Sequence, residues 1–407
     1  MKKPTLWTRN YKILTCASVL GAVGGIAGNY ALSFLVYDET GSTLAAALLI
    51  AIGVIPQFVL PILVAPIMDR LPRKPFLVGG DLLAGILYGL AGLYLTFLDF
   101  NYIGYLLFSL LLASIGSLDS LAYNSIYPKI IPEGFEEKGY AFSGMLYPVM
   151  NVVMMPIAAV LMDTIGVANI LLIQSGLSIS AALIESRIKI TENMRKSEEK
   201  RGISLWWSDF LDGLRYLKGE RGLRSIYAYM AVTNGAYMGY SPILVAFFRT
   251  APGFTTIMYS FFSVAEFLGR TLGGIVNYRM KIPKEKKFAV TFGVYQVYDT
   301  MDAVLLWLPY PLMLVNRAIC GFLGITSATL RQAAVQRYIP EEFRARVNAV
   351  QEASVYAIGS ILALAIGFAG EFLDHRWAMS AAGIFTVCTC WLTVWRNRKY
   401  IKKIYEH

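Results

Sequence analysis

Asp119 is an acidic residue inside a long apolar stretch, residues 102–127. It precedes Lys129 by ten residues, which on a helix is roughly 15 Å at about 1.5 Å per residue. Tyr123 and Tyr127 follow at four-residue intervals and share its helical face. A carboxyl group surrounded by apolar material binds a proton more readily than one in water. We therefore expect Asp119 to take up and release protons; the alternative is a structural carboxylate bonded to a neighbouring hydroxyl.

Glu266 and Arg270 form a second polar group, in the apolar stretch 254–278. A charged residue in an apolar, membrane-spanning helix costs about 2.5–3.5 kcal/mol on insertion scales. A spacing of four residues lets the two pair on one helical face, which lowers this cost. We favour a structural ion pair here, with Glu266 as a second candidate for the proton-carrying residue.

Arg317 lies in the apolar stretch 310–336, and Asp299 and Asp302 lie in the stretch before it. A short turn at 309–311 makes the two stretches antiparallel neighbours, so we expect a buried, structural aspartate–arginine pair. In the alternative interpretation, Arg317 is a cation in a cavity, where it competes with a proton or binds an anionic group.

Polar residues in the middle of apolar stretches predict the lining of a cavity. Asn29 lies in residues 11–37, and Asn234 and Tyr237 share a later stretch. Together with Tyr123, they are our candidate contacts for a small molecule. The chain has 25 tyrosines and 22 phenylalanines, so the cavity should be aromatic, mostly apolar and suited to an amphipathic organic molecule.

The composition places these residues in a membrane protein. Of the 407 residues, 56% are hydrophobic and 16% are charged, and the mean hydropathy of +0.52 excludes an ordinary soluble chain. A hydrocarbon core of roughly 30 Å needs about 20 apolar residues per helix. We predict an all-α membrane protein with twelve transmembrane helices. The predicted spans are residues 11–37, 42–68, 75–98, 102–127, 140–163, 166–186, 222–248, 254–278, 286–308, 310–336, 346–370 and 377–396.

Lysine and arginine residues predict the orientation of these helices, because they gather on the cytoplasmic side of membrane proteins. Both termini, residues 187–221 and the connections on that side hold nearly all of them, Arg331 and Arg337 included. The opposite side has only Arg249 and Arg376. We therefore expect a multi-pass protein of the cell (plasma) membrane with both termini cytoplasmic. The net charge of +10 reflects this topology and attraction to anionic lipid, and it carries no inference of nucleic-acid binding.

The sequence lacks the motifs of the common enzyme and metal sites. The four cysteines all lie inside predicted spans, without the spacing of a zinc site. No Walker A lysine motif, H-E-x-x-H motif or nucleophile elbow is present. We therefore expect no enzymatic activity, no metal and no cofactor.

Residues 187–221 are the only long polar stretch, and they divide the chain into two halves, 1–186 and 222–407. Apolar residues at helical spacing within this linker predict an amphipathic helix on the membrane surface. The halves resemble each other, since Ile131–Phe135 reads I-P-E-G-F and Ile339–Phe343 reads I-P-E-E-F, 208 positions later. A duplicated unit of six spans is an architecture of secondary transporters, which place the substrate site at the repeat interface. We therefore predict two six-helix bundles.

Residues 65–75 read Ala-Pro-Ile-Met-Asp-Arg-Leu-Pro-Arg-Lys-Pro. This segment resembles the loop 2–3 signature of the major facilitator superfamily, with the signature's two glycines replaced. The resemblance implies the major facilitator fold and a gate in which the loop carboxylate meets the N-terminal end of the predicted helix 346–370. A helix dipole favours such a carboxylate by about 0.3–1 kcal/mol; the alternative is a plain basic turn. The expected gating residues are Asp69, Arg70, Arg73 and Lys74.

Three further stretches, residues 39–42, 212–217 and 339–349, resemble the macrolide-efflux-type drug:proton antiporters of that superfamily. The proline of their span 5 motif matches Pro156, but the motif's glycines are missing here. The resemblance implies a proton-coupled exporter of amphipathic organic molecules, a drug or a lipid-like metabolite, that works by alternating access. We expect it to be a monomer. The alternatives are uptake or lipid flipping on the same fold, or a membrane subunit or sensor that does not transport.

Overall fold

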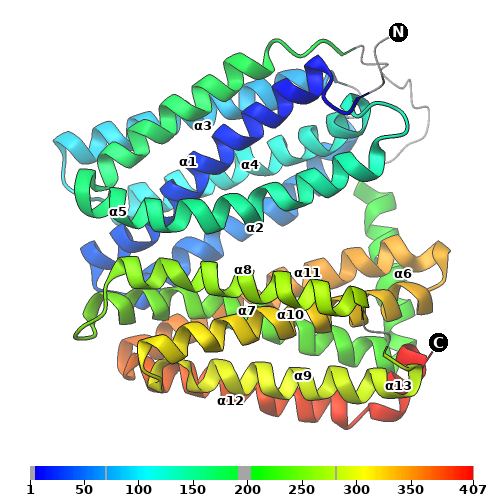
Figure 1. Ribbon diagram of the computed structural model, residues 1–407. Coiled ribbons are helices and arrows are strands. Elements are labelled where there is room, and N and C mark those ends of the chain that lie inside the picture. Colours follow the sequence, from blue (N-terminus) through cyan, green and yellow to red (C-terminus); the bar gives the residue numbers. More distant parts are fainter. Residues whose placement is uncertain (1–4, 69–70, 191–202, 280–281, 407) are drawn as a thin grey trace. The chain divides into compact units, whose positions relative to one another are not determined.

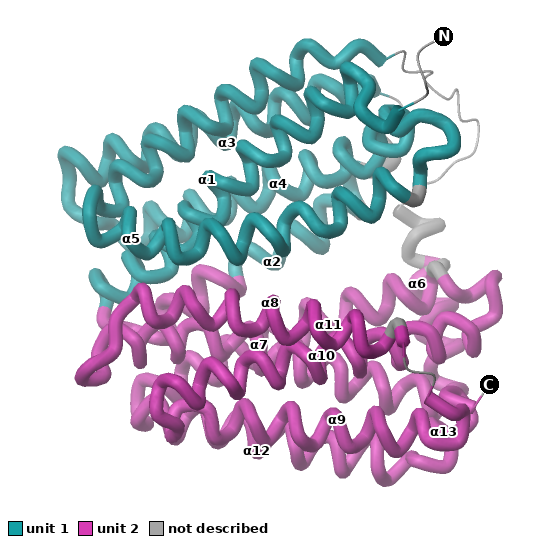
Figure 2. Tube along the Cα trace, viewed as in Figure 1, with its two compact units in different colours: residues 1–40, 52–203 teal, residues 41–51, 204–407 magenta. Residues whose placement is uncertain are grey.

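The structure is helical, as the apolar segments require, because a backbone inside a bilayer must satisfy its hydrogen bonds within itself. The computed structural model describes residues 5–68, 71–190, 203–279 and 282–406, and no β-strand occurs in them (Figure 1). The prediction of an all-α protein is confirmed. The chain divides into two compact units, residues 1–40 with 52–203 and residues 41–51 with 204–407 (Figure 2).

The first unit holds a long helix that contains two predicted spans. This helix, α5, runs through Gly166, whose φ of 77° lies in the left-handed region that glycine adopts without steric cost. The helix therefore breaks there, and its two arms correspond to the predicted spans 140–163 and 166–186. The helices of the unit are α1 (Arg9–Thr40), most of α2 (Thr43–Met68), α3 (Lys74–Phe97), α4 (Tyr102–Ile130) and α5 (Glu136–Glu185).

An apolar cluster fixes one end of this first unit. Tyr11 of α1, Leu77 of α3 and Ile126 of α4 are buried in it together with Ile188, which follows α5. Burial of a large apolar side chain contributes about 1.5–3 kcal/mol. The cluster therefore holds the end of α5 beside α3 and α4.

The second unit contains the remaining helices, among them the short amphipathic helix predicted from residues 187–221. Its elements are α6 (Ile203–Gly219), α7 (Arg221–Thr250), α8 (Thr256–Arg279), α9 (Lys284–Val304), η1 (Leu305–Trp307), α10 (Tyr310–Tyr338), α11 (Glu341–Phe372), α12 (His375–Cys390), η2 (Trp391–Trp395) and α13 (Arg398–Glu406).

Helices α8 and α10 approach each other at two glycines. A Cβ atom on Gly269 would collide with the backbone of Ala318, and one on Gly321 would collide with the backbone of Glu266. Small residues at a helix interface permit this close approach. The contact brings Glu266 and Arg270 beside α10.

The amphipathic helix α6 packs on the first turns of α11. Tyr216 stacks on Phe343, with ring centroids 4.8 Å apart and an interplanar angle of 17°. Asp212 Oδ2 lies 3.9 Å from Arg346 Nη1. The helix thus has a protein partner along part of its length.

The start of α2 belongs to the second unit because Glu371 holds it. Glu371 Oε1 accepts hydrogen bonds from Ser42 Oγ and from the backbone N–H of Leu44, both at 2.8 Å. Thr43 Oγ1 donates to the carbonyl of Gly367 at 2.7 Å. The first turn of α2 is therefore attached to the last turns of α11.

Within the described residues, eight helical segments are long and apolar enough to cross a membrane. One of them, Lys138–Glu185, contains two predicted spans. Helices α7, α8 and α9 do not reach the same hydropathy, and the number of twelve spans remains a prediction. The eight segments are Arg9–Thr40, Thr43–Pro61, Lys74–Phe97, Tyr102–Ile130, Lys138–Glu185, Tyr310–Tyr338, Glu341–Phe372 and His375–Trp395.

Candidate functional site

Asp119 lies on α4 and faces α3 at Gly80, a residue without a side chain. A Cβ atom added to Gly80 would be 3.3 Å from Asp119 Oδ1. This oxygen is buried and has no hydrogen-bond partner in the part of the chain that the structure describes. A buried polar atom without a partner costs free energy, and a proton on the carboxyl group would remove its charge.

Two more carboxyl groups lie in the same neighbourhood. Asp81 follows Gly80 on α3 and interacts electrostatically with Asp119. Glu185, the last residue of α5, interacts with both aspartates. Its side chain is 3% exposed, and Glu185 Oε2 has no hydrogen-bond partner among the described residues. We call Asp81, Asp119 and Glu185 the acidic cluster.

The acidic cluster has no basic counterpart among the residues that the structure describes. No described lysine or arginine forms an ion pair with any of its three members. The sequence analysis selected Asp119 and missed Asp81 and Glu185. Both lie inside predicted spans, 75–98 and 166–186, so the criterion that selected Asp119 would also have selected them.

Two of the predicted cavity residues lie in the first unit. Tyr123 stacks on Tyr127, with centroids 5.2 Å apart, and its hydroxyl lies 3.4 Å from Ser143 Oγ. Asn29 is exposed on α1. The face of α4 that carries Asp119 is therefore aromatic, as its four-residue spacing predicted.

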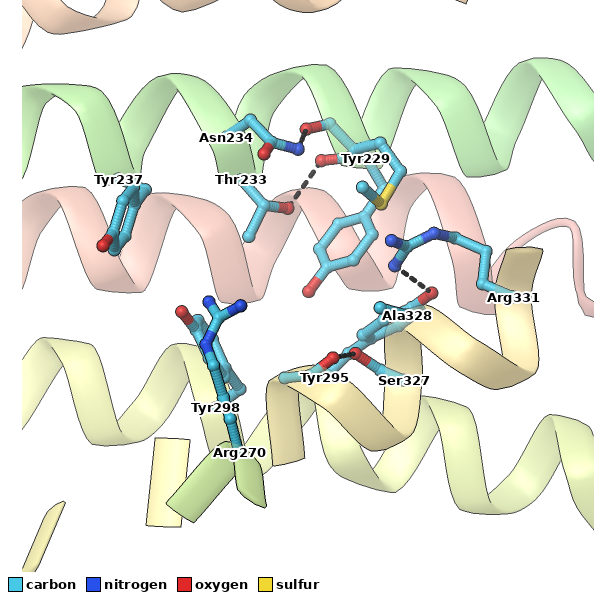
Figure 3. Close-up of a pocket in the computed structure, with 12 residues that line it drawn as sticks. Tyr229, Thr233, Asn234, Tyr237, Arg270, Tyr295, Tyr298, Ser327, Ala328 and Arg331 are labelled. Carbon is cyan, nitrogen blue, oxygen red and sulfur yellow. Dashed lines mark hydrogen bonds between the residues drawn. The ribbon is translucent and has the colours of Figure 1, made fainter. Parts of the chain in front are cut away.

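A cavity of about 250 Å³ lies inside the second unit, among α7, α8, α9 and α10 (Figure 3). It contains Asn234 and Tyr237, which were predicted from the sequence to face a cavity. Four tyrosines and two arginines dominate its wall. The lining residues are Tyr229, Met230, Thr233, Asn234, Tyr237, Arg270, Tyr295, Tyr298, Gly324, Ser327, Ala328 and Arg331.

Arg270 reaches this cavity while bound to an acidic neighbour. Its Nε and Nη2 atoms donate to Glu266 Oε1 at 3.0 and 2.7 Å. The pair follows the four-residue spacing on α8 and is partly exposed, with 53% of the arginine side chain and 18% of the glutamate side chain accessible. Glu266 is therefore largely compensated where it stands.

Arg317 is not among the residues that line the cavity. Its Nη2 atom donates to Asp302 Oδ1 at 2.5 Å and to Asn316 Oδ1 at 2.8 Å. Both charged side chains are at most 5% exposed. Asp299, the other aspartate considered for this pair, accepts a hydrogen bond from the Tyr229 hydroxyl at 2.9 Å instead.

The sequence analysis also did not predict that Arg331 lines this cavity. It was counted with the positive charges of the cytoplasmic side, but it lies on α10 and lines the cavity. Its Nη1 atom donates to the Tyr295 hydroxyl at 3.4 Å, as the dashed line in Figure 3 shows. A charged residue near the end of an apolar span was the only sequence signal that could have found it.

The expected gating loop is only partly described. Asp69 and Arg70 lie outside the described residues. Arg73 is the N-cap of α3, and Lys74 Nζ donates to the carbonyl of Ser186 at 2.6 Å.

The family follows from the sequence match and the fold. Residues 14–295 match the model of the Major Facilitator Superfamily, which is more than half of the chain. The chain belongs to the major facilitator superfamily. As a member of this superfamily, the protein is a multi-pass membrane transporter, and the predicted family is confirmed.

This facilitator is similar to two proteins whose names describe efflux. It is 23% identical over 388 residues to the Multidrug efflux pump Tap of Mycolicibacterium fortuitum, and the match covers 92% of this chain and 94% of the pump. It is 21% identical over 383 residues to Macrolide efflux protein A of Streptococcus pyogenes, with 90% and 89% covered. The similarity therefore extends over both halves of the transporter.

Solved facilitator-like structures share the fold. The nucleoside transporter NupG superposes with a TM-score of 0.70 at 12% identity, covering 97% of this chain and all of that one. A bacterial metal transporter superposes with a TM-score of 0.66 at 14% identity, covering 98% and 99%. At such identities the similarity shows the fold alone, and the predicted fold class is confirmed.

Proposed function

We propose that this transporter exports amphipathic organic molecules in exchange for protons, by alternating access across the plasma membrane. The names of the two similar efflux pumps support export and the class of substrate. The aromatic lining of the cavity in the second unit suits such a substrate. The exchange with protons rests on one observation, namely that the acidic cluster has no basic partner within the described ranges of the chain.

Protons are the natural partners of the acidic cluster. A charged carboxylate in a membrane helix costs about 2.5–3.5 kcal/mol on insertion scales, and nearby carboxylates repel one another. Asp81, Asp119 and Glu185 have no described cation to offset these costs. Binding a proton neutralises a carboxylate without any rearrangement of the helices, so proton occupancy can follow the hydration of the site.

Asp119 is our choice for the central proton carrier within the cluster. It lies within a span, and Tyr123 and Tyr127 follow it on the same face of α4. Two acidic residues of the second unit suit this role less well, because Glu266 is paired with Arg270 and Asp302 with Arg317. Asp299 has no cationic partner among the described residues, but the Tyr229 hydroxyl donates a hydrogen bond to it.

The remaining features complete the proposal. The transporter works as a monomer with both termini in the cytoplasm, and residues 187–221 connect its two bundles, 1–186 and 222–407. Asp69, with Arg70, Arg73 and Lys74, forms a gate on the cytoplasmic side. The distribution of lysine and arginine and the signature at residues 65–75 support these assignments.

A proton-flux assay in proteoliposomes tests the function. The purified protein is reconstituted into liposomes with an acid lumen that contains the pH indicator pyranine. Three probes are added in turn: ethidium, a cation; N-phenyl-1-naphthylamine, which is neutral; and 8-anilinonaphthalene-1-sulfonate, the same ring system with an added sulfonate. An exporter that exchanges substrate for protons should accumulate at least one probe and raise the pH of the lumen as it does so.

The same assay separates the alternatives. A proton-coupled importer would accumulate the probe only when the outside is acid. A subunit or sensor that does not transport would move no probe and no protons beyond protein-free liposomes. Either result would contradict the proposed function.

A further inference from the structure

The cavity of the second unit presents two arginines that differ in their partners. Arg270 is bound to Glu266 through two hydrogen bonds. Arg331 forms no ion pair with any described residue, and it donates a hydrogen bond to the neutral hydroxyl of Tyr295. The wall of the cavity therefore carries one uncompensated positive charge.

No acidic side chain in the described part of the chain forms an ion pair with Arg331. Glu266 is committed to Arg270, and Asp302 is committed to Arg317. Asp299 accepts the hydrogen bond of the Tyr229 hydroxyl. An arginine inside an apolar bundle is costly unless an anion or a set of acceptors satisfies its five donors. A molecule bound in the cavity can supply such an anion.

The residues around Arg331 indicate what the rest of the bound molecule is like. The rings of Tyr229 and Tyr295 are 4.5 Å apart, centroid to centroid, and both line the cavity. Figure 3 shows Arg331 on α10, with the Tyr229 ring of α7 drawn next to its guanidinium group. Tyrosine rings offer flat apolar contact area, and guanidinium groups bind carboxylate, sulfonate and phosphate oxygens through paired N–H groups.

The volume agrees with a small organic molecule. The cavity volume of about 250 Å³ lies just below the range of typical small-molecule sites, which begins at about 300 Å³. A cavity this small holds a ring system with one charged group more easily than a large molecule.

We infer that this cavity binds the oxyanion of an amphipathic aromatic molecule, with Arg331 as its cationic anchor and Tyr229 and Tyr295 as its aromatic wall. The oxyanion is a carboxylate, a sulfonate or a phosphate. The inference rests on the proposed function, whose substrate class it narrows.

Two probes of the proteoliposome assay form a matched pair for this test. 8-Anilinonaphthalene-1-sulfonate and N-phenyl-1-naphthylamine differ only in the sulfonate. Their binding to the transporter in phosphatidylcholine liposomes is measured by equilibrium dialysis against protein-free liposomes. The wild type should bind the sulfonate about tenfold to a hundredfold more tightly than the neutral probe, as expected for hydrogen bonds between charged groups. Equal affinities would overturn the inference.

Variants of Arg331 test whether this residue causes the preference for the sulfonate probe. Arg331→Gln should remove the preference for the sulfonate and leave the binding of the neutral probe within about threefold, which also shows that the variant is folded. Arg331→Lys should retain part of the preference, since it keeps the charge and loses the paired geometry. The control is Arg337→Gln, six residues along α10, where the arginine donates to the carbonyl of Ala333 outside the cavity. A preference that survives Arg331→Gln, or is lost equally in the control, would refute the assignment.

Lipid and free solute are distinguished by a second arm. If a phospholipid headgroup supplies the oxyanion, phosphatidylglycerol in the liposomes should weaken sulfonate binding to the wild type and not to Arg331→Gln. If a free solute supplies it, both lipid mixtures should give the same affinity. Failure of the proposed function can be told from failure of this inference. If the proposed function alone fails, the sulfonate binds through Arg331 but no probe drives proton flux. If the inference alone fails, a probe drives proton flux but Arg331→Gln does not change the preference for the sulfonate.

Discussion

Replacing Asp119 by asparagine should uncouple transport from the proton gradient without damaging the fold. The two side chains have the same shape, and the buried Oδ1 atom of Asp119 has no partner among the described residues to lose. A charged aspartate at the centre of a membrane helix costs about 2.5–3.5 kcal/mol, and Asp81 and Glu185 add repulsion. The neutral variant should therefore be as stable as the wild type, or more stable by up to about 3 kcal/mol.

The stability difference should depend on pH with a defined sign. At low pH the wild-type carboxyl group is protonated and neutral, so the two proteins should unfold alike. As the pH rises, charge appears on the wild type alone, and the asparagine variant should gain its advantage. Reversible unfolding in mixed SDS micelles at several pH values measures this difference.

The transport effect has a calculable size. One pH unit is worth about 1.4 kcal/mol per proton, or about a tenfold concentration ratio. For one proton exchanged per neutral probe without a membrane potential, a gradient of about two units supports roughly hundredfold accumulation in the wild type. Asp119→Asn should accumulate the probe no further than the outside concentration, while exchange of preloaded probe continues.

A matched control and a refuting result complete this test. Asp99→Asn changes an exposed aspartate in the connection between α3 and α4, and it should transport like the wild type. If Asp119→Asn accumulates the probe uphill with unchanged pH dependence, the proton site lies elsewhere. Glu185→Gln and Asp81→Asn would then be tested, followed by Glu266→Gln.

Three further predictions concern the pair, the gate and the packing. Arg317→Met should lower the free energy of unfolding by about 3–5 kcal/mol, because Asp302 stays buried and unpaired, and adding Asp302→Leu should recover most of it in SDS unfolding. Asp69→Asn should slow transport severalfold and leave probe binding intact; lost binding with normal conformational exchange would argue against a gate. Gly321→Ala should cost about 1–3 kcal/mol in the same unfolding assay, whereas Gly274→Ala, where a Cβ atom meets nothing within 4 Å, should be neutral or stabilising.

The fold could be predicted from the sequence because each membrane helix corresponds to one long, continuous stretch of apolar residues. Apolar runs separated by basic connections mark helices regardless of their tertiary contacts. Even the break inside α5 lies at the first residue of the predicted span 166–186, where Gly166 supplies the necessary φ. Gly321 and Gly269 were visible as small residues, but their partners on the neighbouring helix were not, since helix pairing depends on both surfaces at once.

The candidate site was only partly predictable, because a sequence does not show which charges have partners. The turn at 309–311 suggested an aspartate for Arg317, but Asp299 and Asp302 lie three residues apart and share a helical face, so the sequence left both open. In the structure, Asp302 pairs with Arg317, whereas Asp299 accepts a hydrogen bond from the Tyr229 hydroxyl. Arg331 was counted as a topology signal, since lysine and arginine near span ends usually serve that purpose.

The distribution of unpartnered charge limits how protons and substrate can be coupled. The acidic cluster lies in the first unit, and the cavity with Arg331 lies in the second. If both proposals hold, a bound oxyanion does not displace a proton from the residue that it occupies, because its anchor is an arginine, which stays protonated. Coupling must then pass through the conformational change, with each ligand favouring one state of the transporter. This predicts that Arg331→Gln weakens sulfonate binding without altering the number of protons exchanged for each neutral probe, whereas direct competition at one shared residue would change both together.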